Sequence, residues 1–355
     1  MTVVDTRSLG TVLVTGGSGF VGSNFVQTLL EGGNRVKSFD VVPSKLQHPN
    51  LEVIEANICD LIAVQSACEG VDTIFHTAAI IDLKGGKAVS KEYRARSYAI
   101  NVEGTKNLLR AAQAQGASRF VYTASNSVVI GGKPIQNGDE TLAYTERFND
   151  LYTETKVVAE QFVLAANGEK GVYTCSIRPS GIWGPGDQTM FMLMFEQVLS
   201  GLFKARVGSG RALLDNSYVH NLIHGQILAA LNLSEDGTAG GQAYFINDGE
   251  PVNMFDFSKP VIEAIGEKMP TVWVPSFLVK LAMTTWQELH FRFKFPEPPV
   301  PPLGIERVAL HNYFSIEKAR KDLGYKPLYT TEQGLEQCLP FYKRLFNEMK
   351  LQRSV

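Results

Sequence analysis

Residues 11–22 read TVLVTGGSGFVG and join two structural signals in one short stretch. An apolar run rich in β-branched residues is typical of a buried strand, and the glycines that follow it lead directly into a helical pattern over 20–31. Gly16 allows a tight turn off the strand, Gly19 lets the backbone approach a pyrophosphate, and Gly22 lets helix and strand pack closely. The first N–H groups of the helix, around Phe20 and Val21, can bind the anion. The stretch therefore predicts a dinucleotide site.

The order of strand and helix repeats as far as about residue 184. Strand-like runs occupy 11–15, 35–40, 51–55, 73–77, 119–123 and 172–178, and helical patterns occupy 20–31, 61–69, 91–115 and 152–166. Strands that alternate with helices form a parallel sheet covered on both faces. We therefore expect an α/β fold, a doubly wound parallel sheet of the Rossmann type, in which residues 1–184 form the dinucleotide-binding domain.

Beyond Gly184 the alternation becomes irregular. We expect residues 185–355 to form mainly a smaller C-terminal substrate-binding lobe, with part of 210–250 returning to the Rossmann domain. The Met- and Phe-rich segment 190–195 suits either the wall of an apolar pocket or core packing. The proline cluster at 296–302 predicts an extended connector, with a partner-binding polyproline segment as the alternative.

The stretch 272–295 mixes aromatic and basic residues. Charged side chains, among them Lys280, Glu288 and Arg292, interrupt it well before the roughly 20 apolar residues that a membrane span needs. The stretch therefore cannot cross a bilayer unaided. Its composition suits two roles, peripheral contact with a membrane surface or the lid of an apolar substrate pocket.

Composition narrows the class of protein. Of the 355 residues, 44% are hydrophobic and 20% are charged, which excludes a disordered, collagenous or coiled-coil chain. The net charge of -2 supplies no excess of cations, so a nucleic-acid partner is not expected. The four cysteines form no C-x-x-C pair, which indicates neither a disulfide framework nor a zinc site. We therefore expect no metal. Because no charged-then-apolar leader stands at the start, we also expect a cytoplasmic protein.

An acidic residue ends the second strand-like run. Asp40 follows Gly22 by 18 residues, where a carboxylate can accept hydrogen bonds from the ribose hydroxyls of an adenosine and repel a 2′-phosphate. The sequence therefore favours NAD over NADP. Asn57 and Ile58 follow the third run and Asp60 begins the next helix, so one of these residues could meet the adenine. Asp60 could equally be a helix cap.

Tyr152 and Lys156 stand four residues apart in a helical pattern, which places both side chains on one face of the helix. A phenol is a poor base at neutral pH, but a neighbouring ammonium and an oxidised nicotinamide ring both favour the phenolate and lower its pKa. Tyr152 can then accept a proton from a substrate hydroxyl. Lys156 can also donate to the nicotinamide ribose.

Two further polar positions complete a catalytic set. Ser125 follows the fifth strand-like run, at the carboxyl edge where open α/β sheets bind ligands, and can donate to the substrate oxygen. Ser127 is the lesser candidate for this role. Asn101 lies inside the preceding long helix, where its amide can bend the helix and hold a water that leads to Lys156. A solvent-facing asparagine is the alternative.

The chain resembles the extended short-chain dehydrogenase/reductases, and within them the 3β-hydroxysteroid dehydrogenase/isomerase family, in particular its bacterial cholesterol dehydrogenases. The motifs that carry the resemblance are T-G-x-x-G-x-x-G at 15–22, HTAA at 76–79, YTETK at 152–156, IRPSGIWG at 177–184 and DLGYKPL at 322–328. The resemblance implies that Tyr152 is the proton acceptor, Lys156 its electrostatic partner and Ser125 a donor to the substrate. It also implies cofactor contacts at Ala78, Ala79 and Pro179. The chain departs from the family pattern at Thr155, Ala124 and Asn57, where serine, serine and aspartate are common.

The resemblance implies oxidation of the 3β-hydroxyl of a sterol or steroid to the ketone, with hydride passing to NAD. For 5-ene substrates the family can also move the double bond into conjugation, which requires a second acid/base pair. Asp82, Asp187 and Glu154 are available acids, although each suits a cap, turn or solvated position equally well. A homodimer is expected at the level of the fold.

Three other functions remain open. A sterol-4α-carboxylate 3-dehydrogenase would need a cation near the ring carboxylate, for which Lys84, Lys87, Arg94 and Arg96 are available. A sugar-nucleotide epimerase would need a polar diphosphate-binding lobe where this chain has Met and Phe. An NAD-binding redox sensor would need no catalysis, and the retention of Tyr152, Lys156 and Ser125 argues against it.

Overall fold

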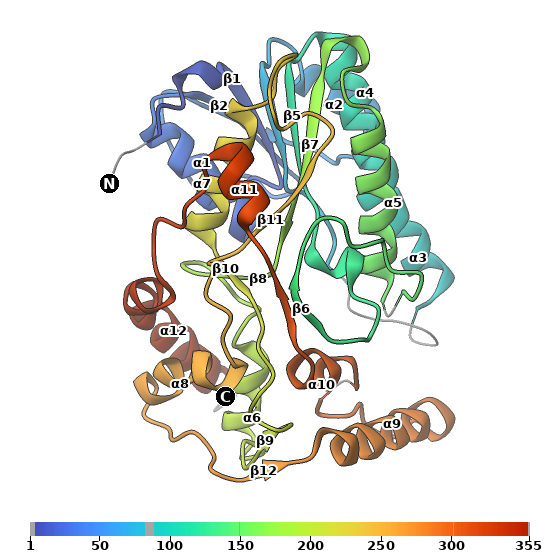
Figure 1. Ribbon diagram of the computed structural model, residues 1–355, viewed down its shortest axis with the longest axis vertical. Helices are drawn as coiled ribbons and strands as arrows, with labels where there is room; N and C mark the ends of the chain where they lie inside the picture. The colour runs from blue at the N-terminus through green and yellow to red at the C-terminus, as the bar shows by residue number, and fades with distance from the viewer. Residues whose placement is uncertain (1–3, 82–88, 149, 301, 354–355) are drawn as a thin grey trace.

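The computed structural model describes residues 4–81, 89–148, 150–300 and 302–353. Within them, seven parallel strands form one sheet in the order β11-β7-β5-β4-β1-β2-β3 (Figure 1). The strands are β1 (Thr11–Thr15), β2 (Arg35–Asp40), β3 (Leu51–Glu55), β4 (Thr73–His76), β5 (Arg119–Thr123), β7 (Tyr173–Pro179) and β11 (Ala243–Ile246). The order reverses between β1 and β4, which is where such sheets bind ligands. The predicted doubly wound α/β fold is confirmed.

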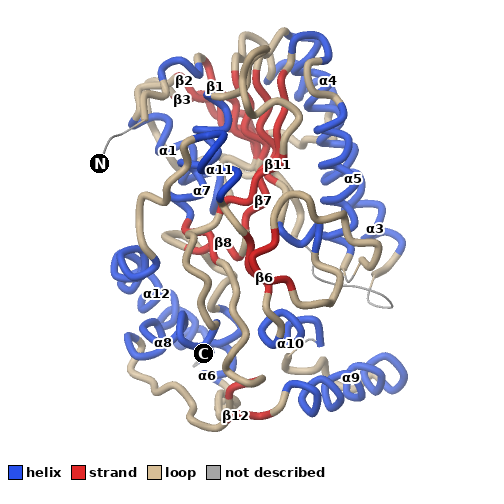
Figure 2. Tube along the Cα trace, in the orientation of Figure 1, coloured by secondary structure: helices blue, strands red, loops and turns tan. Residues whose placement is uncertain are grey.

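Helices cover both faces of the sheet, as Figure 2 shows. One face carries α1 (Phe20–Glu31), α7 (Val219–Leu231) and α11 (Glu317–Leu323), and the other carries α2 (Leu61–Ala67), α4 (Thr105–Gln115) and α5 (Leu151–Ala165). In β1, Val12 and Val14 are buried against the first set while Leu13 is buried against the second. This alternation follows from the two-residue period of a strand. Both faces of the sheet are therefore core.

The long helix predicted over 91–115 is interrupted. It consists of α3 (Lys91–Tyr98), a π-helical turn over Ala99–Gly104 and then α4. A Cβ at Gly104 would lie 2.7 Å from Cγ2 of Ile58, so the turn brings its backbone against the chain that follows β3. Single π-helical turns inside α-helices are frequent at functional sites.

Several segments after β7 build a second group of elements at one end of the sheet (Figure 1), whereas β11, α7 and α11 belong to the sheet and the helices on its face. The helices α6 (Met192–Leu199), α8 (Met254–Ala264) and α12 (Thr331–Arg353) surround a cluster that includes Trp183, Phe191 and Phe195, each at most 1% exposed. These three aromatic residues therefore pack in the core and do not line a pocket. Three two-stranded sheets accompany the helices, β8 (Gly181–Trp183) with β10 (Asn216–Tyr218), β9 (Arg206–Val207) with β12 (Trp273–Val274), and β6 (Ile135–Gly138) with β13 (Asn312–Phe314).

The helix α9 (Ser276–Phe293) lies at the end of the molecule far from the sheet, and α10 (Pro302–Ala309) packs against it (Figure 1). None of the residues of α9 is buried, and large apolar side chains such as Phe277, Leu281 and Phe293 are at least 66% exposed. Pro302 is the first residue of α10, so the extended connector predicted from the proline cluster ends one residue earlier than expected. A proline suits the first turn of a helix because no intrahelical partner exists for its missing N–H.

Candidate active site

The glycine-rich turn between β1 and α1 is built on close backbone contacts. Gly16 has a φ of +70°, and its N–H donates to the carbonyl of Phe39 at 2.8 Å. A Cβ at Gly22 would lie 2.0 Å from the carbonyl oxygen of Gly16, which no side chain tolerates. Gly19 is the extended residue before α1, whose first residues are Phe20 and Val21. The first turn of α1 therefore points its N–H groups toward the switch point of the sheet.

Asp40, the last residue of β2, is held beside this turn. Its Oδ2 accepts a hydrogen bond from the Ser18 N–H and its Oδ1 accepts one from the Val42 N–H, each at 3.1 Å. The ammonium of Lys37, on the same strand, instead donates to the carbonyls of Ala67 and Glu69. A carboxylate, not a cation, therefore lies next to the glycine-rich turn.

The three residues predicted near the adenine have local partners. Asp60 caps α2, because its Oδ1 accepts from the N–H groups of Ile62 and Ala63 at 3.0 and 3.2 Å. The structure thus gives Asp60 the capping role that the sequence left open. Asn57 accepts from the Cys59 N–H at 2.9 Å, and Ile58 is 5% exposed within the core.

The chain leaving β4 passes the same turn. The Cα of Ala78 lies 2.9 Å from where a Cβ of Gly16 would be, and Ala79 follows, half-buried. His76, at the end of β4, is fully buried between the hydroxyls of Thr15 and Thr105, at 2.7 and 2.8 Å. Burial, with the charge of Lys156, lowers the pKa of His76 to about 3, so this imidazole is neutral. Pro179 is the buried last residue of β7, which lies two strands away from β4 in the sheet.

The side chains of Tyr152 and Lys156 lie side by side on α5. The Lys156 ammonium is 5.7 Å from the ring centre of Tyr152 and 4.7 Å from that of Tyr122, and it donates to the carbonyl of Thr123 at 2.6 Å. Lys156 is 2% exposed, and burial lowers its pKa to about 7 although the charge of Glu160 acts in the opposite direction. The predicted pair therefore sits over the carboxyl end of β5.

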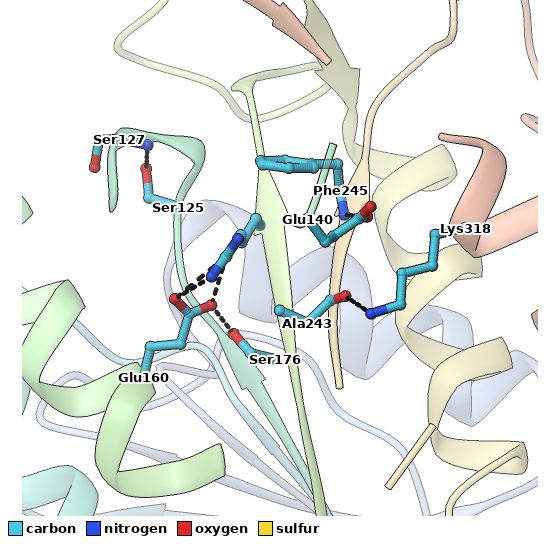
Figure 3. A network of polar contacts seen from close by, with 9 residues as sticks. Ser125, Ser127, Glu140, Glu160, Ser176, Ala243, Phe245 and Lys318 are labelled. Carbon is cyan, nitrogen blue, oxygen red and sulfur yellow. Dashed lines mark hydrogen bonds and ion pairs between the residues drawn. The ribbon is translucent and has the colours of Figure 1, made fainter. Parts of the chain in front are cut away.

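Ser125 lies two residues beyond Thr123 at this same edge. Its Oγ accepts from the Ser127 N–H at 3.1 Å, which leaves the hydroxyl proton of Ser125 available for donation (Figure 3). Ser127 is 9% exposed, and no residue that the structure describes forms a hydrogen bond with its Oγ. Both serines thus stay candidates for the substrate donor, with Ser125 the more accessible.

Asn101 lies in the π-helical turn and is 2% exposed. Its Oδ1 accepts from the Ile80 N–H at 2.8 Å, and its Nδ2 donates to the Ile80 carbonyl and to Oγ1 of Thr155, each at 3.0 Å. The solvent-facing alternative is therefore wrong. Both amide protons of Asn101 are engaged by Ile80 and Thr155, so a water that leads to Lys156 would have to bind an oxygen atom of Asn101.

The acids considered for isomerisation have different surroundings. Asp187 is fully buried in a turn, where it accepts from Thr189 and Met190 and from the hydroxyl of Tyr342. Glu154 accepts from the hydroxyl of Tyr98 at 2.6 Å and pairs with Arg94. Arg96 is exposed. Asp82, Lys84 and Lys87 lie outside the described residues.

One buried network beside α5 was not predicted from the sequence. Glu160, one turn after Lys156, forms an ion pair with Arg178 and accepts from the hydroxyl of Ser176 at 2.6 Å. The sequence could have placed Glu160 near Lys156, because a residue four positions later shares the same helix face. The partners could not be foreseen, since the way α5 packs against β7 decides which side chains face each other.

Comparison with known proteins identifies the family of this chain. The model of the 3-beta hydroxysteroid dehydrogenase/isomerase family matches residues 13–278. A protein of Mycobacterium tuberculosis named 3 beta-hydroxysteroid dehydrogenase/Delta 5→4-isomerase is 62% identical, over 97% of this chain and 94% of its own. A 3-beta-hydroxysteroid dehydrogenase of Mycolicibacterium neoaurum is 64% identical, over the same shares of both chains. The human sterol-4-alpha-carboxylate 3-dehydrogenase, decarboxylating, is 32% identical over 94% of this chain and 88% of its own.

Solved structures share the fold. A short-chain dehydrogenase/reductase superfamily protein from Agrobacterium tumefaciens, solved with bound NAD, superposes with a TM-score of 0.70. It is 21% identical, and the match covers 97% of this chain and 99% of that one. The resemblance predicted from the motifs is confirmed by the family match and by the two bacterial relatives. The chain belongs to the 3-beta hydroxysteroid dehydrogenase/isomerase family.

Proposed function

We propose that this protein is an NAD-dependent 3β-hydroxysteroid dehydrogenase, which oxidises the 3β-hydroxyl of a sterol or steroid to the 3-ketone. The observation that carries the proposal is the buried Lys156 ammonium, held by the Thr123 carbonyl with its charge 5.7 Å from the ring of Tyr152. A cation in a site of low polarity favours the phenolate of a neighbouring tyrosine. The family match supplies the substrate class.

The chain's own residues divide the work of this reaction. Tyr152 accepts the proton of the substrate hydroxyl, Lys156 stabilises the phenolate and donates to the nicotinamide ribose, and Ser125 donates to the substrate oxygen as its charge grows. Asn101 acts through Thr155 and Ile80, because it ties the start of α5 to the chain that leaves β4.

The glycine-rich turn and Asp40 fit NAD. Close contacts at Gly16 and Gly22 leave no room for side chains in the turn, so a pyrophosphate can approach the first N–H groups of α1, at Phe20 and Val21. Asp40 can accept from the ribose hydroxyls. Bound NAD supplies the hydride acceptor. Beside the turn we further propose contacts from Phe20, Val21, Ala78, Ala79 and Pro179.

Adenine contacts from Asn57 and Ile58 remain part of this proposal, whereas Asp60 serves as the cap of α2.

We also propose that residues 1–184 form the NAD-binding domain and that residues 185–355 form mainly the substrate-binding lobe. The exposed helix α9 lies in this lobe, and its apolar side chains suit a sterol or the surface of a membrane from which a sterol is drawn. No helix in the described part of the chain is long and apolar enough to cross a bilayer.

Isomerisation of 5-ene substrates belongs to the proposal because the relative from Mycobacterium tuberculosis carries that activity in its name. The relative from Homo sapiens favours a second candidate, oxidation of a sterol 4α-carboxylate. Among the cations considered for that carboxylate, Arg94 is already paired with Glu154. The proposal also includes a homodimer.

The test is to measure NADH formation with cholesterol, pregnenolone, a 4α-carboxysterol and a UDP-sugar, and to examine the products for the absorbance of a conjugated enone. We expect turnover with 3β-hydroxysteroids, and enone from the 5-ene substrates. Tyr152→Phe should lose at least about 100-fold in kcat while NAD binding is kept. Absence of NADH with every sterol would overturn the assignment, and turnover of the carboxysterol alone would establish the second candidate.

A further inference from the structure

A buried carboxylate lies one helical turn beyond Lys156 on α5. Glu160 is fully buried, and it accepts hydrogen bonds from Nε and Nη2 of Arg178 at 3.0 and 3.1 Å and from Oγ of Ser176 at 2.6 Å (Figure 3). Arg178, on β7, is only 4% exposed. Hence an anion and a cation, both removed from water, lie behind the catalytic pair.

Lys156 needs a counter-charge in this position. Its ammonium donates to the carbonyl of Thr123, which is a neutral acceptor, and otherwise faces the rings of Tyr122 and Tyr152. Burial disfavours the charged form of an amine, whereas a nearby anion favours it. Residues i and i+4 of a helix are neighbours on one face, so Glu160 is placed to act on Lys156 through space.

Other charged and titratable groups around α5 are engaged elsewhere or neutral. His76 on β4 is neutral, and Tyr122 on β5 is a buried phenol whose pKa is raised well above its usual range, chiefly by burial. Further groups near α5 include Arg94 and Tyr98 beside Glu154, Lys106 beside Glu103, Arg110 over the ring of Phe162, Arg178, and Tyr144, whose ring lies beneath the Arg178 guanidinium and whose pKa is raised to about 12, chiefly by burial. Glu160 is therefore the anion within the described residues that best offsets the charge of Lys156.

We propose that Glu160 is a positioning residue for the reaction: its carboxylate, held by Arg178 and Ser176, keeps the Lys156 ammonium charged beside Tyr152. The inference rests on the proposed function, in which the ammonium stabilises the phenolate. A neutral lysine cannot do so. The proton would then stay on Tyr152. Phenol and amine would both be neutral, which is the inactive arrangement of this pair.

Glu160→Gln should change the pH profile of turnover in a specific way. The substitution leaves two buried cations without an anion and lowers the proton affinity of Lys156 more than that of Tyr152, which is two turns away. Both limbs of the kcat/KM profile should move to lower pH, and the maximum should fall by about 10-fold. A purely structural role would lower the maximum and leave the limbs in place.

A second variant should reverse part of this shift in the pH profile. Adding Arg178→Met to Glu160→Gln removes one of the two unpaired cations, so the profile should move back toward that of the original chain. The double variant also leaves no unpaired buried charge from the ion pair, and it should fold even where the single variant does not. A structural role for the ion pair would make the double variant at least as impaired as the single.

The titration of Lys156 can be followed without any substrate. Lysine labelled with ¹³C at Cε reports its own protonation by NMR, and the Lys156 signal is the one that Lys156→Met removes. We expect the midpoint to fall by about one pH unit in Glu160→Gln and to lie between this value and the original one in the double variant. Glu317→Gln, which removes an exposed carboxylate paired with Arg320, should leave it unchanged.

An unchanged midpoint in Glu160→Gln would overturn the inference, as would a double variant that titrates at or above the original midpoint. If the midpoint shifts as expected while the original chain oxidises no steroid, the proposed function fails and the electrostatic coupling stands.

Discussion

The amide nitrogen of Asn101 donates a hydrogen bond to Oγ1 of Thr155, 3.0 Å away, and the same hydroxyl donates to the carbonyl of Tyr152 at 2.9 Å. The π-helical turn and the helix that carries the Tyr152–Lys156 pair are thereby joined through one side chain. Asn101 also holds both backbone groups of Ile80, so three segments meet at a single amide.

Asn101→Ala should therefore destabilise the protein and lower its activity. The change leaves partly buried backbone groups of Ile80 without their partner, which costs up to about 1–3 kcal/mol. Urea unfolding and kcat measure the two effects. Thr155→Ser keeps the hydroxyl and should be close to the original chain, whereas Thr155→Val should lower kcat with a smaller loss of stability. Equal behaviour of the two Thr155 variants would contradict a positioning role for this hydroxyl.

Substitution of the two serines distinguishes the substrate donor. Ser125→Ala removes the hydroxyl whose proton is available at the edge of the sheet, and we expect kcat to fall by about 100-fold, as for loss of a donor to a developing oxyanion. Ser127→Ala removes a buried hydroxyl and should change kcat by less than about threefold. The reverse ranking in steady-state kinetics would assign the role to Ser127.

Gly22→Ala should abolish NAD binding. The added Cβ would lie 2.0 Å from the carbonyl oxygen of Gly16, so the turn must move, at a cost of about 1–3 kcal/mol in overpacking alone. Gly19→Ala, whose Cβ would lie 3.3 Å from the same oxygen, should fold normally and lose affinity for NAD only. Thermal unfolding and calorimetric titration with NAD separate the two results, and tight NAD binding by Gly22→Ala would rule out the proposed phosphate site.

Asp40→Asn should weaken the preference for NAD. The change removes the charge that repels a 2′-phosphate and weakens charged hydrogen bonds worth about 1.5–3 kcal/mol each, so kcat/KM with NAD should fall at least about 10-fold while NADP begins to be used. Asp60→Asn is the matched control, because Asp60 caps α2 and should affect stability alone. If both variants lost activity with NAD to the same extent, the assignment of Asp40 to the ribose would be wrong.

Stability should fall as the pH rises through the range in which a buried aspartate ionises. Burial raises the pKa of Asp215 to about 7, and the nearby Asp248 acts in the same direction, although the N–H of Phe314 donates to Asp215 and opposes the shift. An unfolded aspartate titrates near pH 3.9, so between about pH 4 and 7 the folded chain binds more protons and its free energy of unfolding decreases with pH.

Urea unfolding at pH 5 and pH 8 measures this effect. Asp215 alone should contribute on the order of 2 kcal/mol to the decrease. Asp215→Asn, which keeps an oxygen acceptor and carries no charge, should flatten the dependence. Asp236→Asn, at an exposed position, should not. An unchanged decrease in Asp215→Asn would mean that the carboxylate is already ionised across the whole range.

Local sequence was sufficient for several elements of the sheet and for the positions that one helix or one turn defines. The bounds of α1 and of β1, β2, β3 and β5 agree with the prediction. They do so because apolar period, glycine spacing and capping act over a few residues. For the same reason, the four-residue spacing of Tyr152 and Lys156 was enough to assign both side chains to one face of a helix.

Contacts between distant segments depended on the tertiary structure. Whether Asp60 meets a ligand or caps a helix, and whether Trp183 and Phe191 line a pocket or fill a core, depends on which elements pack together. The pairing of Glu160 with Arg178 joins α5 to β7, and the bridge from Asn101 to Thr155 joins the π-helical turn to α5. Sequence spacing specifies neither, because both depend on the assembly of sheet and helices around a shared core. The sequence by itself thus determined the family, several elements of the sheet and its helices, and the shared helix face of Tyr152 and Lys156, and the packed structure decided which buried partners surround that pair.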